Sequence, residues 1–227
     1  MEQLAALSGT PKFETWHKHL EENRIQVNTI EPLYIHRTQK DNSVLFALLK
    51  VDATTPDDTK LPAICFLKGD SVSILVVLID EETDDKYVVL VKQRRICNGS
   101  NLYEHPAGKI DKDDSSPQEV AAREIKEETQ LDAEANELKP LFRRPLFSAT
   151  ATSDEALHFF YLERRMPLVD IKAIHSRKTG EAGENEHTQL YVATFVEAHH
   201  LVGNIHGILG HLLYLQRISD FDTMSKL

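Results

Sequence analysis

The sequence predicts a mixed α/β fold in which one central helix accompanies a sheet, with a small β-rich region before it. Strand-like apolar runs recur through the first 100 residues, the longest being residues 72–79 (VSILVVLI). One helix with clear start signals follows at Pro117, and residues 206–218 read as a closing helix. A sheet combined with one central helix and helices at the end is typical of layered α/β proteins.

The first region is expected to span residues 1–69. Residues 11–23 predict a short amphipathic helix, because Phe13, Trp16 and Leu20 recur on one of its sides. Strands are expected within residues 24–37, 43–52 and 61–69, with a turn-rich loop between the last two.

The second region is expected to span residues 70–219, followed by an exposed tail at 220–227. It is predicted to begin with a hairpin of residues 71–80 and 86–95 across an acidic loop, followed by the central helix. Strand and loop then alternate over 138–162. A strand after 167, a Gly-rich acidic loop, a strand near 188–195 and the closing helix complete the region. We find no internal repeat.

Composition excludes several classes of protein. The net charge of −10 argues against nonspecific binding of nucleic acid, which needs a basic surface. Two cysteines, Cys65 and Cys97, form no disulfide framework and favour a reducing compartment. No apolar run is long enough to span a bilayer, so we expect no membrane insertion. A small phosphorylated substrate remains compatible if metal ions supply positive charge.

The central helix carries a costly cluster of acids. Ser116, Pro117 and Glu119 fit a capping box that starts the helix. Glu124, Glu127 and Glu128 then follow at i, i+3 and i+4, where like charges repel. Glu124 and Glu128 fall about 40° apart, on the apolar side of the helix. A solvated face is the alternative, but such a face should not coincide with the apolar one.

The segment from Gly108 to Leu131 resembles the Nudix box, through Gly108, Arg123-Glu124-Ile125-Lys126-Glu127-Glu128-Thr129 and Leu131. Three features depart from it: Asp114 replaces the first glutamate, the spacer to Arg123 is one residue longer, and Gln130 replaces the closing glycine. Gln130 should therefore cost about 1 kcal/mol or end the helix differently.

The chain is similar over nearly its whole length to the ADP-sugar pyrophosphatase branch of Nudix hydrolases. The similar segments are FETWHKHLEENRI, LPAICFLKGDSVSILVVLID, VLVKQRR and LYEHPAGKID. The resemblance implies an α/β/α sandwich with a mixed sheet, an N-terminal β region, and a homodimer in which that region helps form the partner's site.

The resemblance also implies a metal site. Mg²⁺ prefers hard oxygen ligands, and Mn²⁺ is an alternative. Glu124 and Glu128 are the best candidate ligands, Glu127 is a third, and the carbonyl of Ala107 is added by resemblance. Gly108, Arg123 and Asp114 would be structural, with Arg123 pointing away from the metal face and paired to Asp114 or Asp111.

Substrate contacts are implied at Arg95, in a Gln-x-Arg pattern, and at Glu104. Exposed charges at strand ends are the alternative for both. In this branch a glutamate on a mobile loop acts as the base, which matches Glu186 best, with Glu184 in reserve. A solvated acidic loop is the alternative there.

The function expected is Mg²⁺-dependent hydrolysis of nucleoside diphosphate sugars to a nucleoside monophosphate and a sugar phosphate. ADP-ribose or ADP-glucose is the expected substrate, with GDP-mannose as a further candidate. Coenzyme A or NADH diphosphatase activity is an alternative, although the PAG segment lacks the Pro-Gly-Gly arrangement of the first. A nucleotide-sugar-binding module without turnover is another alternative.

Two other features carry separate expectations. The histidines at 199, 200, 206 and 211 fit no common metal motif, and we interpret them as helix-surface or core residues. Ser225-Lys226-Leu227 matches the tripeptide read by the peroxisomal import receptor, which predicts a peroxisome or glycosome. A cytoplasmic location is expected if the tripeptide is not read.

Overall fold

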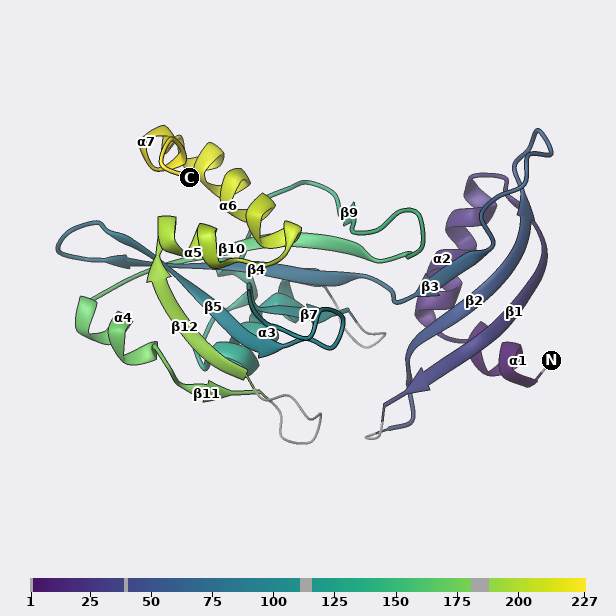
Figure 1. Cartoon of the computed structure of the whole chain (residues 1–227), viewed down its shortest axis with the longest axis horizontal. Coiled ribbons are helices and arrows are strands. Elements are labelled where there is room, and N and C mark those ends of the chain that lie inside the picture. The colour runs from purple at the N-terminus through teal and green to yellow at the C-terminus, as the bar shows by residue number, and fades with distance from the viewer. Residues whose placement is uncertain (1, 39–40, 111–115, 181–187) are drawn as a thin grey trace. The chain divides into compact units, whose positions relative to one another are not determined.

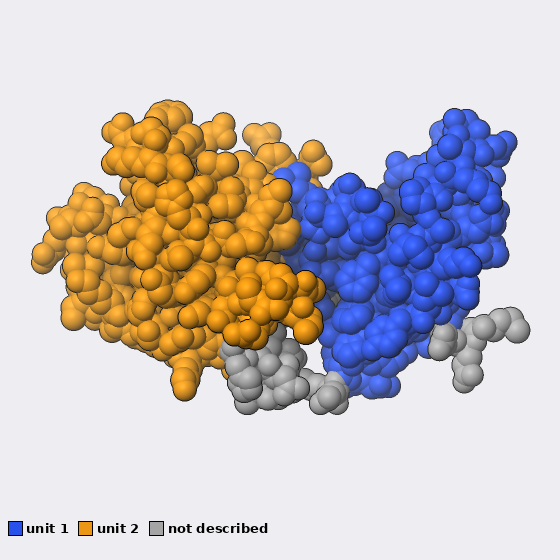
Figure 2. All heavy atoms as spheres, in the orientation of Figure 1, with its two compact units in different colours: residues 1–71, 109–113, 146–157 blue, residues 72–108, 114–145, 158–227 orange. Residues whose placement is uncertain are grey.

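The computed structural model describes residues 2–38, 41–110, 116–180 and 188–227. The chain divides into two compact units, coloured separately in Figure 2. Unit 1 comprises residues 1–71 with the segments 109–113 and 146–157, and unit 2 comprises residues 72–108, 114–145 and 158–227. The mixed α/β class that the sequence predicts is confirmed.

Unit 1 is built on a three-stranded antiparallel sheet in the order β1-β2-β3, seen with its two helices in Figure 1. The elements are α1 (Glu2–Ser8), α2 (Pro11–Glu22), β1 (Gln26–Arg37), β2 (Val44–Thr54) and β3 (Ile64–Leu67). Phe13 and Trp16 of α2 are buried in one core cluster with Ala47 and Leu49 of β2. The predicted helix and three strands are therefore present, and α1 is an element that we did not expect.

The two faces of this sheet differ because successive strand residues point to opposite sides. The odd-numbered residues of β2 from 47 to 53 are buried in the helix-covered core. The other face carries a row of rings from three strands: Tyr34 lies 6.1 Å from His36, His36 lies 4.8 Å from Phe46, and Phe46 lies 5.1 Å from Phe66. Tyr34 is 53% exposed.

A second feature of unit 1 is a buried carboxylate. β9 (Leu146–Phe147) pairs with the first residues of β10 (Ala156–Met166). Glu155, just before β10, is 8% exposed and accepts hydrogen bonds from Lys68, from Ser148 at 2.7 Å and from Ser71 at 3.2 Å. Burial would raise the pKa of Glu155, but the Lys68 ammonium and the two hydroxyl groups hold it below the ordinary value.

The second sheet has the strand order β11-β12-β5-β4-β10-β8, while β6 pairs with β5 and β7 pairs with β4. Its remaining strands are β4 (Ser71–Asp80), β5 (Lys86–Arg94), β6 (Asn101–Glu104), β7 (Ala107–Lys109), β8 (Lys139–Pro140), β11 (Lys178–Thr179) and β12 (Thr188–Thr194). All ten residues of β4 are buried, as expected for a central strand. The predicted hairpin is the antiparallel pair β4–β5.

Helices lie on both sides of this sheet. They are α3 (Pro117–Thr129), α4 (Leu168–Ile174), α5 (Phe195–Leu201), α6 (Ile205–Ile218) and α7 (Phe221–Met224), with a 3-10 turn at Ala135–Glu137. In Figure 1, α3 and α6 lie on opposite sides of the sheet. Within the described ranges, no helix combines the length and apolar character needed to cross a membrane.

One local expectation was wrong. The strand expected after residue 167 is the helix α4, in which Ile171 and Ile174 are buried at helical i, i+3 spacing while Val169 is 71% exposed. The stretch expected as an exposed tail, 220–227, stays a prediction; it contains the short helix α7, which Asp220 caps by accepting the N–H of Thr223 at 3.0 Å.

Candidate active site

The central helix α3 starts where the sequence predicts. Ser116 is extended, with φ −156°, and its hydroxyl oxygen accepts the N–H of Glu119 at 3.3 Å. The Ser116 hydroxyl also lies 3.2 Å from the carboxylate of Glu119 and donates to it. The helix therefore has its N-cap, and the Glu119 side chain reinforces it through the Ser116 hydroxyl.

The three candidate metal ligands of α3 divide by exposure. Glu128 is 8% exposed, and the Glu124 side chain is 15% exposed. Glu124 lies four and three residues after the buried Val120 and Ala121, and Glu128 lies three residues after the buried Ile125. Glu127 is exposed. The helical phase thus places two carboxylates against protein, as predicted, and leaves the third candidate ligand on the surface.

Both inward carboxylates meet strand β7. The backbone N–H of Ala107 donates to Oε2 of Glu128 at 2.9 Å. A Cβ atom built on Gly108 would lie 2.0 Å from Cδ of Glu124, a separation that no real side chain tolerates. Only glycine at 108 therefore lets the Glu124 carboxylate occupy its position. The Ala107–Gly108 backbone and the two glutamates form one compact group within unit 2.

Arg123 does not point away from this group, contrary to expectation. Its Nη2 lies 3.5 Å from Oε1 of Glu124. The neighbouring guanidinium partly offsets the charge of a carboxylate that is mostly removed from water. The partners expected for Arg123, Asp114 and Asp111, lie outside the described residues.

Arg95 and Glu104 are also brought together. Nε of Arg95 donates to Oε2 of Glu104 at 2.8 Å, and Nδ2 of Asn204 donates to Oε1 at 3.0 Å. Within the described part of the chain, the two terminal nitrogens of Arg95 have no hydrogen-bond partner. Arg94, in contrast, uses its Nη1 to hold the carbonyl of Gly99 at 3.0 Å. Of Arg94 and Arg95, it is therefore Arg95 that has both terminal guanidinium nitrogens available to an anion.

The arginine and the acidic group are close along the chain. Glu104 and Ala107 are three residues apart, which limits the distance between their Cα atoms to about 11 Å. The N–H of Ile74 in β4 holds the intervening carbonyl of Pro106 at 2.9 Å. The short β6–β7 connection thus keeps the Arg95–Glu104 pair near the backbone that Glu124 and Glu128 meet, within unit 2.

The donor set beside β7 suits a hard cation. Glu124 and Glu128 offer carboxylate oxygens, which Mg²⁺ and Mn²⁺ prefer over nitrogen or sulfur. Among the residues that the structure describes, no group of three His, Cys, Asp or Glu side chains is close enough to hold a metal ion. The fit of a metal ion therefore depends on the two carboxylates and on the space that the missing side chain of Gly108 leaves for Glu124. The candidate bases Glu184 and Glu186 lie outside the described residues, so their role stays a prediction.

Two of the histidines, His105 and His211, pack against each other in the core. His211 is fully buried and His105 is 4% exposed, and their Nε2 atoms are 3.1 Å apart. Burial lowers the pKa of His105 to about 3 and that of His211 to about 2, so both rings are neutral in ordinary buffers. The interpretation of the later histidines as core or surface residues is consistent with this arrangement.

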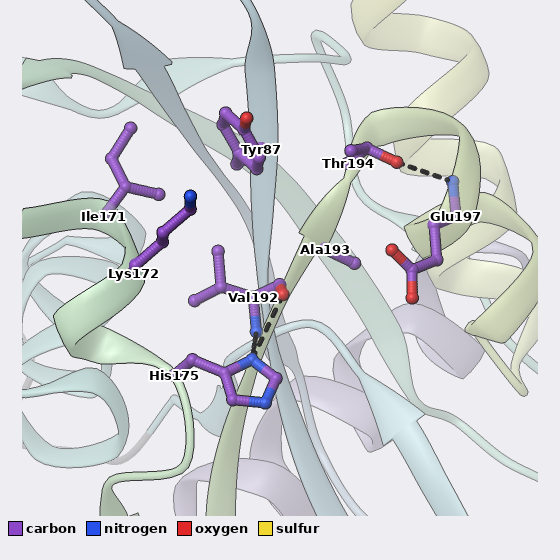
Figure 3. A pocket seen from close by; sticks show the side chains of 8 residues that line it. All are labelled: Tyr87, Ile171, Lys172, His175, Val192, Ala193, Thr194 and Glu197. Atoms are coloured by element: carbon purple, nitrogen blue, oxygen red, sulfur yellow. Dashed lines mark hydrogen bonds between the residues drawn. The ribbon is translucent and has the colours of Figure 1, made fainter. Parts of the chain in front are cut away.

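A separate hollow of about 370 Å³, drawn in Figure 3, lies elsewhere in unit 2. It is lined by Tyr87, Ile171, Lys172, His175, Val192, Ala193, Thr194 and Glu197. Thr194 pairs with Tyr87 at the start of β5, whereas Arg94 and Arg95 follow at the other end of that strand. Of the predicted site residues that the structure describes, none lines this hollow.

The fold and the acidic helix define a family. Residues 69–195, more than half of the chain, match the NUDIX domain family. The chain belongs to the Nudix family, and the resemblance of its acidic segment to the Nudix box is confirmed.

Individual relatives support the same placement. The chain is 29% identical over 134 residues to Nudix hydrolase 14, chloroplastic, of Arabidopsis thaliana, and this match covers 55% of this chain but 43% of the plant protein. A crystal structure described as an ADP compounds hydrolase is similar in fold, with a TM-score of 0.61, over 86% of this chain and 95% of its own. Sequence identity to that protein is 17%, so the likeness shows the shared fold alone.

Proposed function

We propose that this protein is a Mg²⁺-dependent pyrophosphohydrolase that cleaves ADP-ribose or ADP-glucose to AMP and a sugar phosphate. GDP-mannose is a further substrate candidate. The family membership supports hydrolysis of a diphosphate, and the fold it shares with an ADP compounds hydrolase supports an ADP-containing substrate. The observation that carries the proposal is the meeting of Glu124 and Glu128 at Ala107 and Gly108.

Each residue of the site has a distinct task. Glu124 and Glu128 would hold divalent cations, with the carbonyl of Ala107 and Glu127 as further candidate ligands. A bound cation neutralises charge on the diphosphate and lowers the pKa of a coordinated water. The Arg95 fork binds phosphate oxygens, for which its planar geometry is suited. Glu186, or Glu184 in its place, would take the proton of the attacking water.

A substrate panel tests this proposal. The purified protein is incubated with ADP-ribose, ADP-glucose, GDP-mannose, coenzyme A or NADH, first with Mg²⁺, then with Mn²⁺, then with a chelator. We expect AMP from the two ADP-sugars, and none with the chelator. Preferred cleavage of coenzyme A or NADH would instead identify the alternative hydrolase. Binding of ADP-ribose without release of AMP under any condition would identify a binding module.

We also propose that the protein forms a homodimer through unit 1 and enters a peroxisome-type organelle. The exposed ring of Tyr34 at one end of the aromatic row supports the proposed homodimer.

Exposure of Ser225 and Lys226 supports the proposed import. Residues 218–227 fused to a fluorescent reporter should direct it to peroxisomes, and deletion of Leu227 should leave it cytoplasmic. A reporter that stays cytoplasmic with the intact segment would contradict the import proposal.

A further inference from the structure

Asn204 caps helix α6 and reaches a residue one hundred positions earlier. Its backbone is extended, with φ −131° and ψ 155°, and its Oδ1 accepts the N–H of Gly207 at 2.8 Å. Its Nδ2 donates to Oε1 of Glu104 at 3.0 Å. Because a carboxylate only accepts hydrogen bonds, the amide nitrogen must face Glu104, and the oxygen is left for the helix.

Backbone contacts bring Asn204 to this place. The N–H of Gly203 donates to the carbonyl of Tyr103 at 3.1 Å, so the α5–α6 connection lies against strand β6. A Cβ atom on Gly203 would lie 2.6 Å from Cδ2 of Leu102. A side chain at 203 would therefore require the end of the Leu102 side chain to shift. The hydrogen bond between Gly203 and Tyr103 sets the amide of Asn204 beside the Glu104 carboxylate.

Glu104 is satisfied on both oxygens by protein groups. Oε1 accepts from Asn204 and Oε2 accepts from Nε of Arg95 at 2.8 Å, while the Glu104 side chain is 13% exposed. The Asn204 contact fixes the rotation of the carboxylate, and the carboxylate in turn fixes Nε of Arg95. Glu104 binds Nε of Arg95 and leaves the two terminal nitrogens of the guanidinium group for another partner.

We propose that Asn204 is a positioning residue which, through Glu104, aims the terminal nitrogens of Arg95 at a phosphate group of the substrate. This inference rests on the proposed function. It also assigns Glu104 to Arg95 rather than to direct contact with the substrate. A guanidinium held by Nε presents its remaining two nitrogens as a pair, the geometry for bidentate binding of phosphate.

The residue type at 204 distinguishes this role from simple helix capping. Ser, Thr, Asp and Asn all cap helices well. Asp has no donor for Glu104, and the single hydroxyl group of Ser is shorter than the amide of Asn. Only Asn offers an acceptor for the helix and a separate donor for the carboxylate. Asn204→Ser therefore keeps the cap and removes the contact with Glu104.

The test compares Asn204→Ser with Thr194→Ala. Thr194 caps α5 through its Oγ1, and among the residues that the structure describes it forms no hydrogen bond with Arg95 or Glu104, so Thr194→Ala removes a cap without touching the network. With ADP-ribose and Mg²⁺, we expect Asn204→Ser to raise KM about ten-fold and to leave kcat within about two-fold, because Arg95 binds phosphate before and during the reaction. Thr194→Ala should keep the wild-type KM. A wild-type KM in Asn204→Ser overturns the proposal.

A second readout needs no turnover. The Nε–Hε group of Arg95 gives a nitrogen–proton NMR signal whose shift reports its hydrogen bond to Glu104. We expect this signal to move or to exchange faster with water in Asn204→Ser, but not in Thr194→Ala. If the wild type hydrolyses no nucleotide sugar, the proposed function fails, and the Arg95 signal still decides this inference: an unchanged signal overturns it.

Discussion

At the scale of single residues, Gly108 meets a strict steric requirement. The atoms that its missing side chain would meet are Cδ, Oε1 and Cγ of Glu124, all at the far end of a flexible chain. A larger residue at 108 would therefore move the Glu124 carboxylate rather than the backbone. The fold should survive such a change, while the position of a candidate metal ligand should not.

We predict that Gly108→Ala lowers kcat/KM for ADP-ribose about 100-fold, since a displacement of about 1 Å at a reacting group can cost that much. Its thermal midpoint should stay close to that of the wild type. Gly9→Ala is the matched control, because a Cβ at Gly9 meets nothing within 4 Å. Equal activity of the two variants would show that the Glu124 position does not matter for catalysis.

Sequence reasoning reaches some of these residues and misses others for a physical reason. Periodicity on one helix is local, so it placed Glu124 and Glu128 on the protein-facing side. The pairing of Glu104 with Asn204 joins positions one hundred apart, which no local pattern encodes. A sequence signal for Asn204 exists only as a helix cap, and that signal does not name Glu104 as its partner.

At the scale of elements, helix α3 ends against its residue preference. Gln130 is its C-cap in the left-handed region, with φ 60° and ψ 17°, and its N–H bonds to the carbonyl of Lys126 at 3.0 Å. The helix thus ends in the conformation that the expected glycine would adopt. A non-glycine residue there carries strain of about 1 kcal/mol.

We predict that Gln130→Gly raises the free energy of unfolding by about 0.5–1 kcal/mol, since glycine relieves the left-handed strain but adds freedom to the unfolded chain. Urea unfolding monitored by circular dichroism measures the change. Gln130→Ala keeps the strain and should show no such gain. A destabilised Gln130→Gly variant would mean that the weak contact of Gln130 with the carbonyl of Lys178, at 3.5 Å, matters more than the backbone strain.

The contact of Glu155, just before β10, with Lys68, just after β3, should make the free energy of unfolding depend on pH. The folded pKa of Glu155 lies below its ordinary value of 4.5. Its stabilising contribution is therefore fully present above about pH 4.5 and is lost as the pH falls through the folded pKa. Asp154 beside it has a pKa raised by burial, which has the opposite sign, so a variant comparison is needed.

We predict that the wild type exceeds Glu155→Gln in free energy of unfolding at pH 6, and that this difference shrinks steadily below pH 4.5. Urea unfolding at several pH values measures it. Glu14→Gln, on the exposed side of α2, is the comparison variant and should differ little from the wild type at pH 6. A difference for Glu155→Gln that stays constant with pH would mean that its carboxylate does not gain its stability from Lys68 and the serines.

The elements that the sequence misassigned are short. Residues 168–174 are rich in β-branched apolar residues, which favoured a strand, yet the burial of Ile171 and Ile174 three residues apart follows a helix. Short helices give too few turns for periodicity to decide between the two. The long hairpin β4–β5 and the capped helix α3 were predictable because each carries several agreeing signals.

At the scale of the whole molecule, the proposed homodimer gives the next prediction. The wild type should elute in light-scattering chromatography with twice the chain mass of 25.8 kDa. Tyr34→Glu places a charge beside the aromatic row of unit 1 and should give a monomer. Val169→Glu changes an exposed apolar residue of unit 2 and should remain dimeric. A monomeric wild type, or a dimeric Tyr34→Glu variant, would contradict the proposed interface.

The proposed hydrolase activity depends most on the two inward carboxylates of α3. The most direct test is the rate at which Glu128→Gln releases AMP from ADP-ribose in saturating Mg²⁺, compared with the wild type and with Glu82→Gln on an exposed loop. We predict a loss of about 1,000-fold in kcat for Glu128→Gln with its thermal midpoint retained, and none for Glu82→Gln. Wild-type turnover by a folded Glu128→Gln protein would contradict the assignment of this site.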